Sequence, residues 1–398
     1  MPDRDILFDL TEFLHDPQRS GIQRVCHEIV AHWPDSSRLV PARVDERSRL
    51  LALPPEVLDV YRAYFQAPAA DLPGLKEQMR ELAQRGRNVS ARGFRPYRGL
   101  LNATVFSLPY QVEYYFWAAQ RGLTDRFFLF VHDVLLWTHP ELFTPGFGIN
   151  LFNYLRCLRA VPNLAFNSEQ TRSETLDRML RDGRQPGPVC PLGAESLGVA
   201  APRFNPAKRR FTVVGTIEPR KNHRAVLDAF DQLWMEGVNV ELAFAGKLGW
   251  AREDDRQRIL QLQAEEPHFH LLDSLGDAQL VEAIRGSRAT IYPALHEGYG
   301  LPPVESLSQG VPVIVTDSLP SVAMLRPEGQ VRLGSPTAES IRQAVSLLLD
   351  NTFAARKTEE ISRLRLPTWS AMAERLERWI ENPRESVREP IQELARAA

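Results

Sequence analysis

Short apolar runs and stretches with helical spacing alternate along most of the chain. An apolar run of four to seven residues that ends in polar residues predicts a buried strand with an accessible carboxyl end. The predicted strands are 6–10, 127–131, 164–168, 211–215, 240–246, 289–292 and 311–316. Positions Ile22, Val25, Ile29 and Val30 have the spacing of an amphipathic helix. Alternating strands and helices predict parallel sheets with crossover helices.

A proline-punctuated segment at 200–206 is typical of a linker and divides the pattern in two. We therefore expect an α/β protein with two Rossmann-like, doubly wound domains that face a central cleft. The predicted domains are 1–205 and 206–375, and the helical segment 376–398 is expected to cross back to the first domain. Ligands of open parallel sheets bind beyond the carboxyl ends of the strands, so the predicted site lies there.

Composition narrows the classes of protein that this sequence can encode. Of the 398 residues, 43% are hydrophobic and 25% charged, which excludes a disordered or collagen-like chain. The sequence has 48 Lys and Arg residues and 50 Asp and Glu residues, so the protein as a whole has almost no net charge. Its overall electrostatic field therefore does not attract nucleic acid, and no nucleic-acid partner is expected.

The cysteines and the terminus predict a cytoplasmic protein. Cys26, Cys157 and Cys190 are too far apart for a zinc motif, and their odd number suits a reducing compartment. The first residues are acidic where a signal peptide is basic, and the most apolar stretch, 127–137, is interrupted by polar residues. We expect neither export nor a membrane span.

The strongest chemical signal is the sequence Tyr-Pro-Ala-Leu-His-Glu-Gly-Tyr-Gly-Leu-Pro-Pro-Val-Glu at 292–305. It predicts a strand end, a glycine loop and a helix start, where backbone N–H groups and the helix dipole favour an anion. Glu297 precedes the loop and Glu305 lies about one turn into the helix. Carboxylates repel phosphate and accept hydrogen bonds from hydroxyls, so they are expected to bind the sugar and the ribose on either side of a phosphate.

A second signal, Gly-Thr-Ile-Glu-Pro-Arg-Lys-Asn-His at 215–223, follows a predicted strand directly. The adjacent cations Arg220 and Lys221 suit a diphosphate that becomes more negative as the bond to it breaks. The alternative is a solvated basic turn with Glu218 as its neighbour. The sequence lacks the Gly-Lys-Ser/Thr ending of a P-loop.

Together these two motifs resemble those of the retaining glycosyltransferases of family 4, which have the GT-B fold, and in particular bacterial mannosyl- and rhamnosyltransferases of surface polysaccharides. The resemblance is specific from Phe211 to about Thr316. It is weaker but concordant in the first half, for example in Ser20-Gly21-Ile22 and Val131-His132-Asp133. One departure is Leu319-Pro320-Ser321-Val322, where members often have Leu-Pro-Glu-Val.

The resemblance assigns roles to individual residues. It implies that Glu305 binds the nucleotide ribose, Glu297 the donor sugar, and Arg220 with Lys221 the diphosphate, and that His132 lies beside the donor sugar as a catalytic residue. The remaining donor-binding residues that it implies are Gly21, Gly215, Gly298, Tyr299, Gly300 and Leu301. Base contacts are expected from the loop 272–276. A lone histidine at a strand end is more often structural, which is the alternative for His132.

No metal or cofactor is expected. Asp3-Arg4-Asp5 has the Asp-x-Asp pattern of metal-dependent sugar transferases, but it precedes the first strand, and no other acidic cluster is suitably placed. The arginines at 85, 87, 92, 95 and 98 predict a solvated loop or, alternatively, a surface for an anionic acceptor or a membrane, which would be a peripheral contact.

The sequence therefore predicts a retaining, metal-independent hexosyltransferase of polysaccharide biosynthesis. The expected partners are a nucleotide-sugar donor, with a GDP-sugar of mannose or a deoxyhexose favoured, and a glycan or lipid-linked acceptor. The alternatives are a nucleotide-sugar epimerase or hydrolase of the same fold, or a sugar-nucleotide-binding relative without turnover. Nothing in the sequence indicates an oligomeric state.

Overall fold

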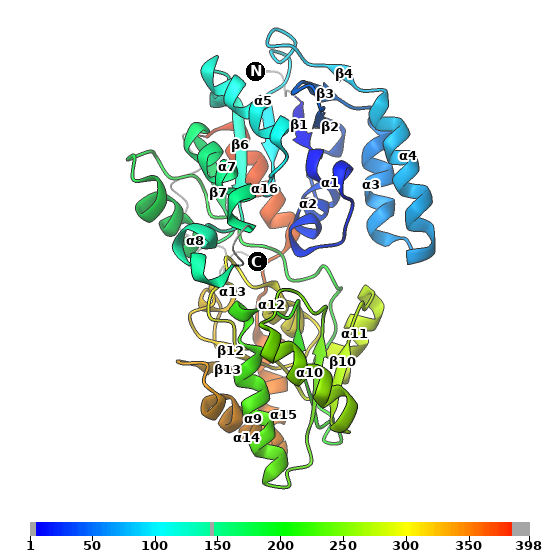
Figure 1. Ribbon diagram of the computed structural model, residues 1–398, viewed down its shortest axis with the longest axis vertical. Helices are drawn as coiled ribbons and strands as arrows, with labels where there is room; N and C mark the ends of the chain where they lie inside the picture. The colour runs from blue at the N-terminus through cyan, green and yellow to red at the C-terminus, as the bar shows by residue number, and fades with distance from the viewer. Residues whose placement is uncertain (1–4, 144–146, 384–398) are drawn as a thin grey trace. The chain divides into compact units, whose positions relative to one another are not determined.

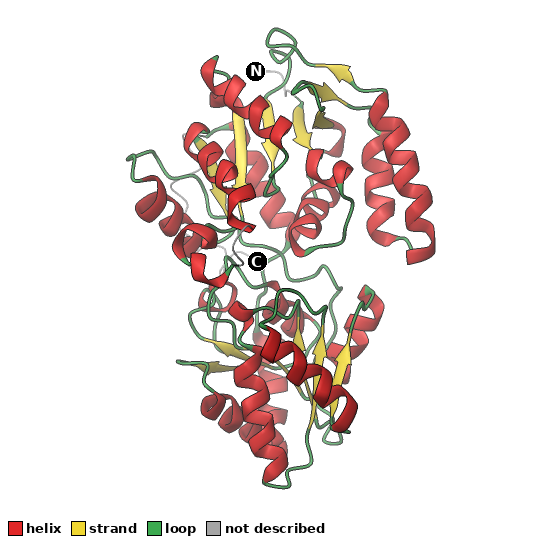
Figure 2. Cartoon of the chain, in the orientation of Figure 1, coloured by secondary structure: helices red, strands yellow, loops and turns green. Residues whose placement is uncertain are grey.

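The computed structural model describes residues 5–143 and 147–383. The chain divides into two compact α/β units. Unit 1 comprises the described part of 1–192 and of 369–393, and unit 2 comprises 193–368. Figure 2 shows strands covered by helices in each unit.

Unit 1 is built on a seven-stranded sheet in the order β4-β3-β2-β1-β5-β6-β7. β1, β2, β5, β6 and β7 are parallel, whereas β3 and β4 pair antiparallel at one edge. The strands are β1 (Ile6–Asp9), β2 (Leu39–Val44), β3 (Leu50–Ala52), β4 (Arg87–Asn88), β5 (Gly99–Asn102), β6 (Phe127–Val131) and β7 (Asn163–Phe166).

Helices cover this sheet, and α3 and α4 lie side by side in Figure 1. The helices are α1 (Thr11–His15), α2 (Gly21–Ala31), α3 (Glu56–Gln66), α4 (Leu72–Gln84), α5 (Pro109–Gln120), α6 (Leu135–Thr138), α7 (Phe147–Ala160), α8 (Glu169–Ser173) and α16 (Trp369–Glu381). All five residues of β6 are buried, as expected for a central parallel strand.

Unit 2 has a six-stranded, fully parallel sheet in the order β10-β9-β8-β11-β12-β13. This is the doubly wound order of a Rossmann fold, in which the direction of strand addition reverses between β8 and β11. The strands are β8 (Arg210–Val214), β9 (Glu241–Ala245), β10 (Phe269–Leu272), β11 (Ala289–Tyr292), β12 (Val313–Thr316) and β13 (Gln330–Leu333).

Helices α9 to α13 of unit 2 connect successive strands, and α14 and α15 follow the last strand; α9 and α14 pack against each other. They are α9 (His223–Met235), α10 (Glu253–Glu265), α11 (Asp277–Gly286), α12 (Leu301–Ser308), α13 (Pro320–Ala323), α14 (Ala338–Leu349) and α15 (Asn351–Glu360). Two parallel-sheet α/β units are the fold class expected from the sequence.

The division between the units differs from the predicted boundary at 205. The segment from Gly193 onward belongs to unit 2 because its backbone is tied to α12 and the residues after it. The N–H of Ala200 donates to the carbonyl of Ser308 (2.8 Å), and Gln309 Nε2 donates to the carbonyl of Leu197 (3.0 Å).

The whole of α16 belongs to unit 1, whereas the sequence placed its first residues in the second domain. Trp379 packs edge-to-face on Phe128 of β6 (ring centroids 5.1 Å apart), and Arg38 pairs with Glu377 and Glu381. Of the predicted crossing segment 376–398, residues 384–398 lie outside the described residues.

Candidate functional site

The two motifs of unit 2 meet at the carboxyl ends of β8 and β11. These strands are neighbours in the sheet, and the strand order reverses between them. In doubly wound sheets this switch point is where ligands bind. The hydrogen bond from the N–H of Leu295 to the carbonyl of Arg220 (2.8 Å) joins the two motifs directly.

The turn after β8 is held rigidly by its backbone. The N–H of Gly215 donates to Ala245 and the N–H of Ile217 to Lys247, so the turn continues the pairing of β8 with β9. A short 3-10 turn then covers Pro219–Lys221, and Asn222 adopts the left-handed conformation (φ 57°) before α9 begins. This backbone fixes the starting points of both basic side chains.

Four charged side chains form one cluster at this point. Arg220 pairs with two carboxylates, Glu218 through Nη2 (2.6 Å) and Glu297 through Nη1. Lys221 Nζ lies 4.0 Å from Glu218 Oε1, and Tyr292 donates its hydroxyl to Glu297 (2.6 Å). The two cations predicted for a diphosphate are therefore compensated by two acids.

Burial and charge act against each other in this cluster. Burial lowers the pKa of the Lys221 ammonium, and the negative charge of Glu297 opposes this shift. Burial alone would raise the pKa of Glu297, but Arg220 and Lys221 outweigh it and hold that pKa below its usual range. Glu297 is therefore ionised at neutral pH, and the acids support the charge on both cations.

The glycine loop leads into α12 as the sequence predicted. Gly300 has φ 87°, a left-handed conformation that favours glycine, and prolines occupy the first turn of α12. Glu305 lies within this helix and is 6% exposed. The backbone N–H groups near Leu301 and the positive end of the helix dipole lie at the same end of the sheet as Lys221.

Gly215, which the resemblance implied as a donor-binding residue, lies beside the side chain of Lys221. Its φ is 123°, and a Cβ at this position would overlap the ammonium of Lys221. The absence of a side chain at Gly215 therefore makes room for the lysine side chain.

We expect Gly215→Ala to destabilise the protein by ~1–3 kcal/mol, because alanine is strained at this φ, and also to displace Lys221. Urea unfolding measures the first effect, and the affinity for a nucleoside diphosphate measures the second. The matched variant Gly286→Ala, at a position where a Cβ meets nothing within 4 Å, serves as the control. Unchanged affinity in Gly215→Ala would contradict this role.

The remaining predicted residues, Gly21 and His132, lie in unit 1. Gly21 begins α2, where Ser20 caps the helix by accepting from the N–H of Gln23. His132 follows β6, is 5% exposed, and places Nε2 2.7 Å from the carbonyl of Ala103. Its surroundings fit a structural role, the alternative stated above.

Burial lowers the pKa of His132 to about 4. The unfolded chain therefore takes up a proton near pH 6.5 that the folded chain resists, and stability is lost as pH falls from about 6.5 towards 4, by up to about 3 kcal/mol. We expect His132→Gln to flatten this loss in urea titrations at pH 7 and pH 4.5. His223, with a pKa lowered to about 3, contributes in the same direction and remains. His268→Gln, at a partly exposed position, is the control, and an unchanged slope in His132→Gln would refute the assignment.

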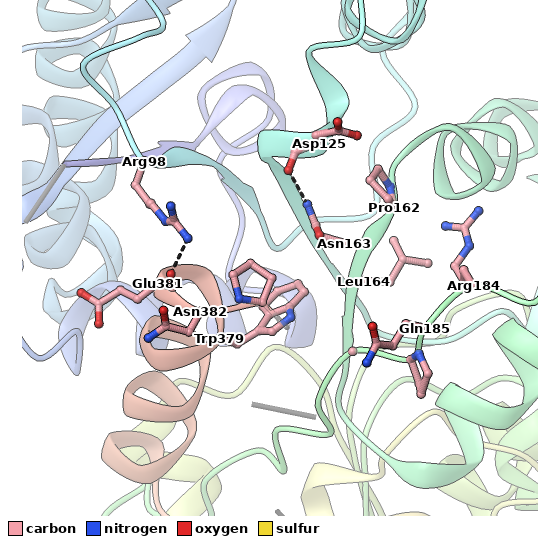
Figure 3. Close-up of a pocket in the computed structure, with 13 residues that line it drawn as sticks. Arg98, Asp125, Pro162, Asn163, Leu164, Arg184, Gln185, Trp379, Glu381 and Asn382 are labelled. Carbon is pink, nitrogen blue, oxygen red and sulfur yellow. Dashed lines mark hydrogen bonds between the residues drawn. The ribbon is translucent and has the colours of Figure 1, made fainter. Parts of the chain in front are cut away.

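The basic tract separates into exposed and structural arginines. Arg85, Arg87, Arg92 and Arg95 are exposed, whereas Arg98 donates to the carbonyls of Ile380 and Glu381 at the end of α16. Figure 3 shows Arg98 at a pocket of about 580 Å³, with Trp379 from α16 on the same side. This pocket lies at the amino ends of β6 and β7 and contains no predicted donor-binding residue.

Sequence reasoning missed two members of the cluster, Glu218 and Tyr292. Both residues lie within the quoted motifs. Nothing in the sequence distinguishes a carboxylate beside two cations, or a tyrosine at a strand end, from a residue without a functional role.

The loop expected to contact a base, 272–276, begins at the last residue of β10, at the carboxyl end of that strand. Ser274 in this loop has a left-handed backbone (φ 57°). Of the Asp-x-Asp string, residues 3 and 4 lie outside the described residues.

Among the described residues, no group of three or more His, Cys, Asp or Glu side chains could hold a metal ion. Within the same ranges, no helix has the length and apolar character needed to cross a bilayer. All three cysteines are free and buried.

Residues 199–365 match the profile of the family described as "Glycosyl transferases group 1". A serotype-specific mannosyltransferase, WbdA, of Escherichia coli is 26% identical over 393 residues, which cover 93% of this chain and 46% of that protein. The O-antigen chain mannosyltransferase B of Escherichia coli is 36% identical over 112 residues, 27% of this chain and 29% of that protein. The chain thus spans about half the length of the first of these relatives. The expected resemblance to bacterial mannosyltransferases of surface polysaccharides is confirmed.

Solved structures confirm the predicted fold. Anabaena Alr3699/HepE, in complex with UDP and glucose, superposes with a TM-score of 0.62 at 13% identity, over 96% of this chain and 100% of that chain. Sucrose-phosphate synthase from Thermosynechococcus elongatus gives a TM-score of 0.60 at 13% identity, over 96% of this chain and 99% of that chain. At such identities the likeness concerns the fold, which is GT-B.

Proposed function

We propose that this chain, whose residues 199–365 form a glycosyl transferases group 1 domain in a GT-B fold, is a retaining, metal-independent hexosyltransferase of polysaccharide biosynthesis. The observation that carries the proposal is the cluster of Arg220, Lys221 and Glu297 at the β8/β11 switch point of unit 2, next to the glycine loop and α12. A site with these charges suits a nucleotide diphosphate sugar.

Each charged residue contributes a distinct interaction to donor binding. Lys221 and Arg220 attract the diphosphate and stabilise the charge that develops on it as the glycosidic bond breaks. The backbone N–H groups of the glycine loop donate to phosphate or sugar oxygens, as the resemblance implies. Glu305 accepts from the ribose and Glu297 from the sugar hydroxyls.

The departing diphosphate gains negative charge, and Arg220, Lys221 and the dipole of α12 supply positive charge without a metal ion. Retention would come from attack on the face that the diphosphate leaves, through an oxocarbenium-like state, as the resemblance implies. Two inversions through a covalent intermediate are the alternative. Since the chain matches mannosyltransferases of O-antigen synthesis, we favour a GDP-sugar donor, a glycan or lipid-linked acceptor, and the cytoplasm as the compartment. The four exposed arginines between 85 and 95 would offer positive charge to an anionic acceptor or membrane surface.

A panel of UDP, GDP, ADP and dTDP tests the donor site by thermal stabilisation. A nucleotide at about a hundredfold above its Kd adds about 2.7 kcal/mol of stability, and we expect GDP to give the largest shift. Transfer from the matching nucleotide sugar should then proceed at the same rate in EDTA. No shift with any nucleotide would refute the donor site, and a loss of transfer in EDTA would refute metal independence.

The alternatives are separated by the product. An epimerase or hydrolase converts the nucleotide sugar without an acceptor, and a binding protein leaves it unchanged. A product that forms only when a glycan acceptor is added, and that contains both sugars, supports the transferase over both.

A further inference from the structure

Glu218 has the most buried side chain of the four charged residues in the cluster. Its side chain is 2% exposed, compared with 11% for Glu297 and 19% for Arg220. Its carboxylate lies 2.6 Å from Arg220 Nη2 and 4.0 Å from Lys221 Nζ. One buried acid thus contacts both cations that the proposed function assigns to the diphosphate.

Hydrogen bonds on both sides of Glu218 restrain the backbone of the turn. The N–H of Ile217 donates to Lys247, and the N–H of Lys221 donates back to the carbonyl of Glu218 (3.1 Å). Asn222 Nδ2 donates to the carbonyl of Pro336 (2.7 Å), which anchors the end of the turn. The backbone of this turn therefore holds Glu218 in a fixed position relative to Arg220 and Lys221.

Glu297 is the second acid on Arg220, but it is also the residue assigned to the sugar hydroxyls. Both tasks compete for the same carboxylate, since Glu297 already accepts from Tyr292 and pairs with Arg220. When Glu297 turns to a sugar, Arg220 retains a compensating acid only if Glu218 stays in place. A buried cation without a partner is costly.

We propose that Glu218 is a positioning residue for the donor diphosphate: it holds Arg220 and Lys221 in place from the buried side while Glu297 is released to the sugar. This inference rests on the proposed function and adds to it a residue that does not touch the substrate. Because Glu218 is negative, it also favours the charged form of Lys221, which burial disfavours.

The experiment compares pH profiles of kcat/KM for the nucleotide sugar in the wild type, Glu218→Gln and Glu218→Asp. Glutamine preserves the shape and removes the charge, so we expect kcat/KM at pH 7 to fall at least about tenfold. The alkaline limb should also move to lower pH by about one unit or more, because Lys221 loses a neighbouring negative charge. Aspartate keeps the charge, so its alkaline limb should stay near that of the wild type.

Several other groups face Lys221 and are unchanged in these variants. They are Arg220, Glu297, Glu305, His223 and the ring of Tyr292. The control is Glu241→Gln, which removes an acid from an arginine pair (2.8 Å to Arg210) at the opposite end of the β8–β9 ladder. It should leave both the rate and the alkaline limb unchanged.

Suppose that the wild type is active and Glu218→Gln is folded. An unshifted alkaline limb in this variant would then leave the proposed function intact and overturn the positioning role. An equal shift in Glu218→Asp overturns it as well, because the charge is still present. If Glu218→Gln does not fold, the aspartate variant decides: a lowered kcat with an unshifted limb supports the role, and wild-type kcat overturns it. A wild type that neither binds a nucleoside diphosphate nor transfers a sugar refutes the proposed function, and the role of Glu218 falls with it.

Discussion

Lys221→Ala should lower kcat/KM for the nucleotide sugar by about 10²- to 10³-fold, the usual cost of removing one group that stabilises charge in a transition state. The lysine is largely buried beside Gly215 and Glu218, at the carboxyl end of β8. Since burial already disfavours its charge, the loss of the side chain affects turnover more than folding. Steady-state kinetics and urea unfolding of the same preparations measure the two effects.

The matched control is Lys357→Ala on α15, which also removes a lysine paired with a carboxylate (2.8 Å from Glu360). It should keep the wild-type kcat/KM. A Lys221→Ala variant with wild-type kcat/KM would contradict the role assigned to the lysine, and equal losses in both variants would show that the effect is not specific to this site.

Glu297→Gln should have opposite effects on two ligands. A free nucleoside diphosphate should bind more tightly, by about 1 kcal/mol or about fivefold, because a negative charge leaves the site and Arg220 becomes available. Transfer from the nucleotide sugar should fall about 10- to 100-fold, because the sugar hydroxyls lose a charged acceptor. Calorimetry with the diphosphate and kinetics with the sugar donor measure the two changes.

Glu360→Gln, which removes the acid of the Lys357 pair, should change neither quantity. If Glu297→Gln weakened both ligands, the carboxylate would support the site as a whole rather than exchange between Arg220 and the sugar. If it changed neither, Glu297 would have no part in donor binding.

The apolar pattern was sufficient for β1, β6, β7, β8, β9, β11 and β12. It missed β2 and β5, which lie inside the first sheet, and also β3, β4, β10 and β13. β6, β8 and β11 are short apolar runs, and the structure places them within a residue of their predicted bounds. β13 contains Gln330 and Arg332, and β4 has only two residues, both exposed, so neither has the apolar pattern of a buried strand.

The sequence was sufficient to predict which two motifs come together in unit 2. It was not sufficient to predict which charged side chains pair with one another. The two motifs meet because β8 and β11 are neighbours, which follows from the doubly wound order. The pairing of Arg220 with Glu218 and Glu297 depends on side-chain directions that motif spacing does not specify. The same holds for Gly215, where the space is taken by Lys221.

The most direct measurement is a crystal structure of the protein with GDP bound, or with whichever nucleoside diphosphate stabilises it most. The account predicts phosphate oxygens within hydrogen-bond distance of Lys221 Nζ and of the backbone at Gly298–Leu301, with the ribose at Glu305. A nucleotide bound away from the ends of β8 and β11, or a diphosphate out of reach of Lys221, would contradict it.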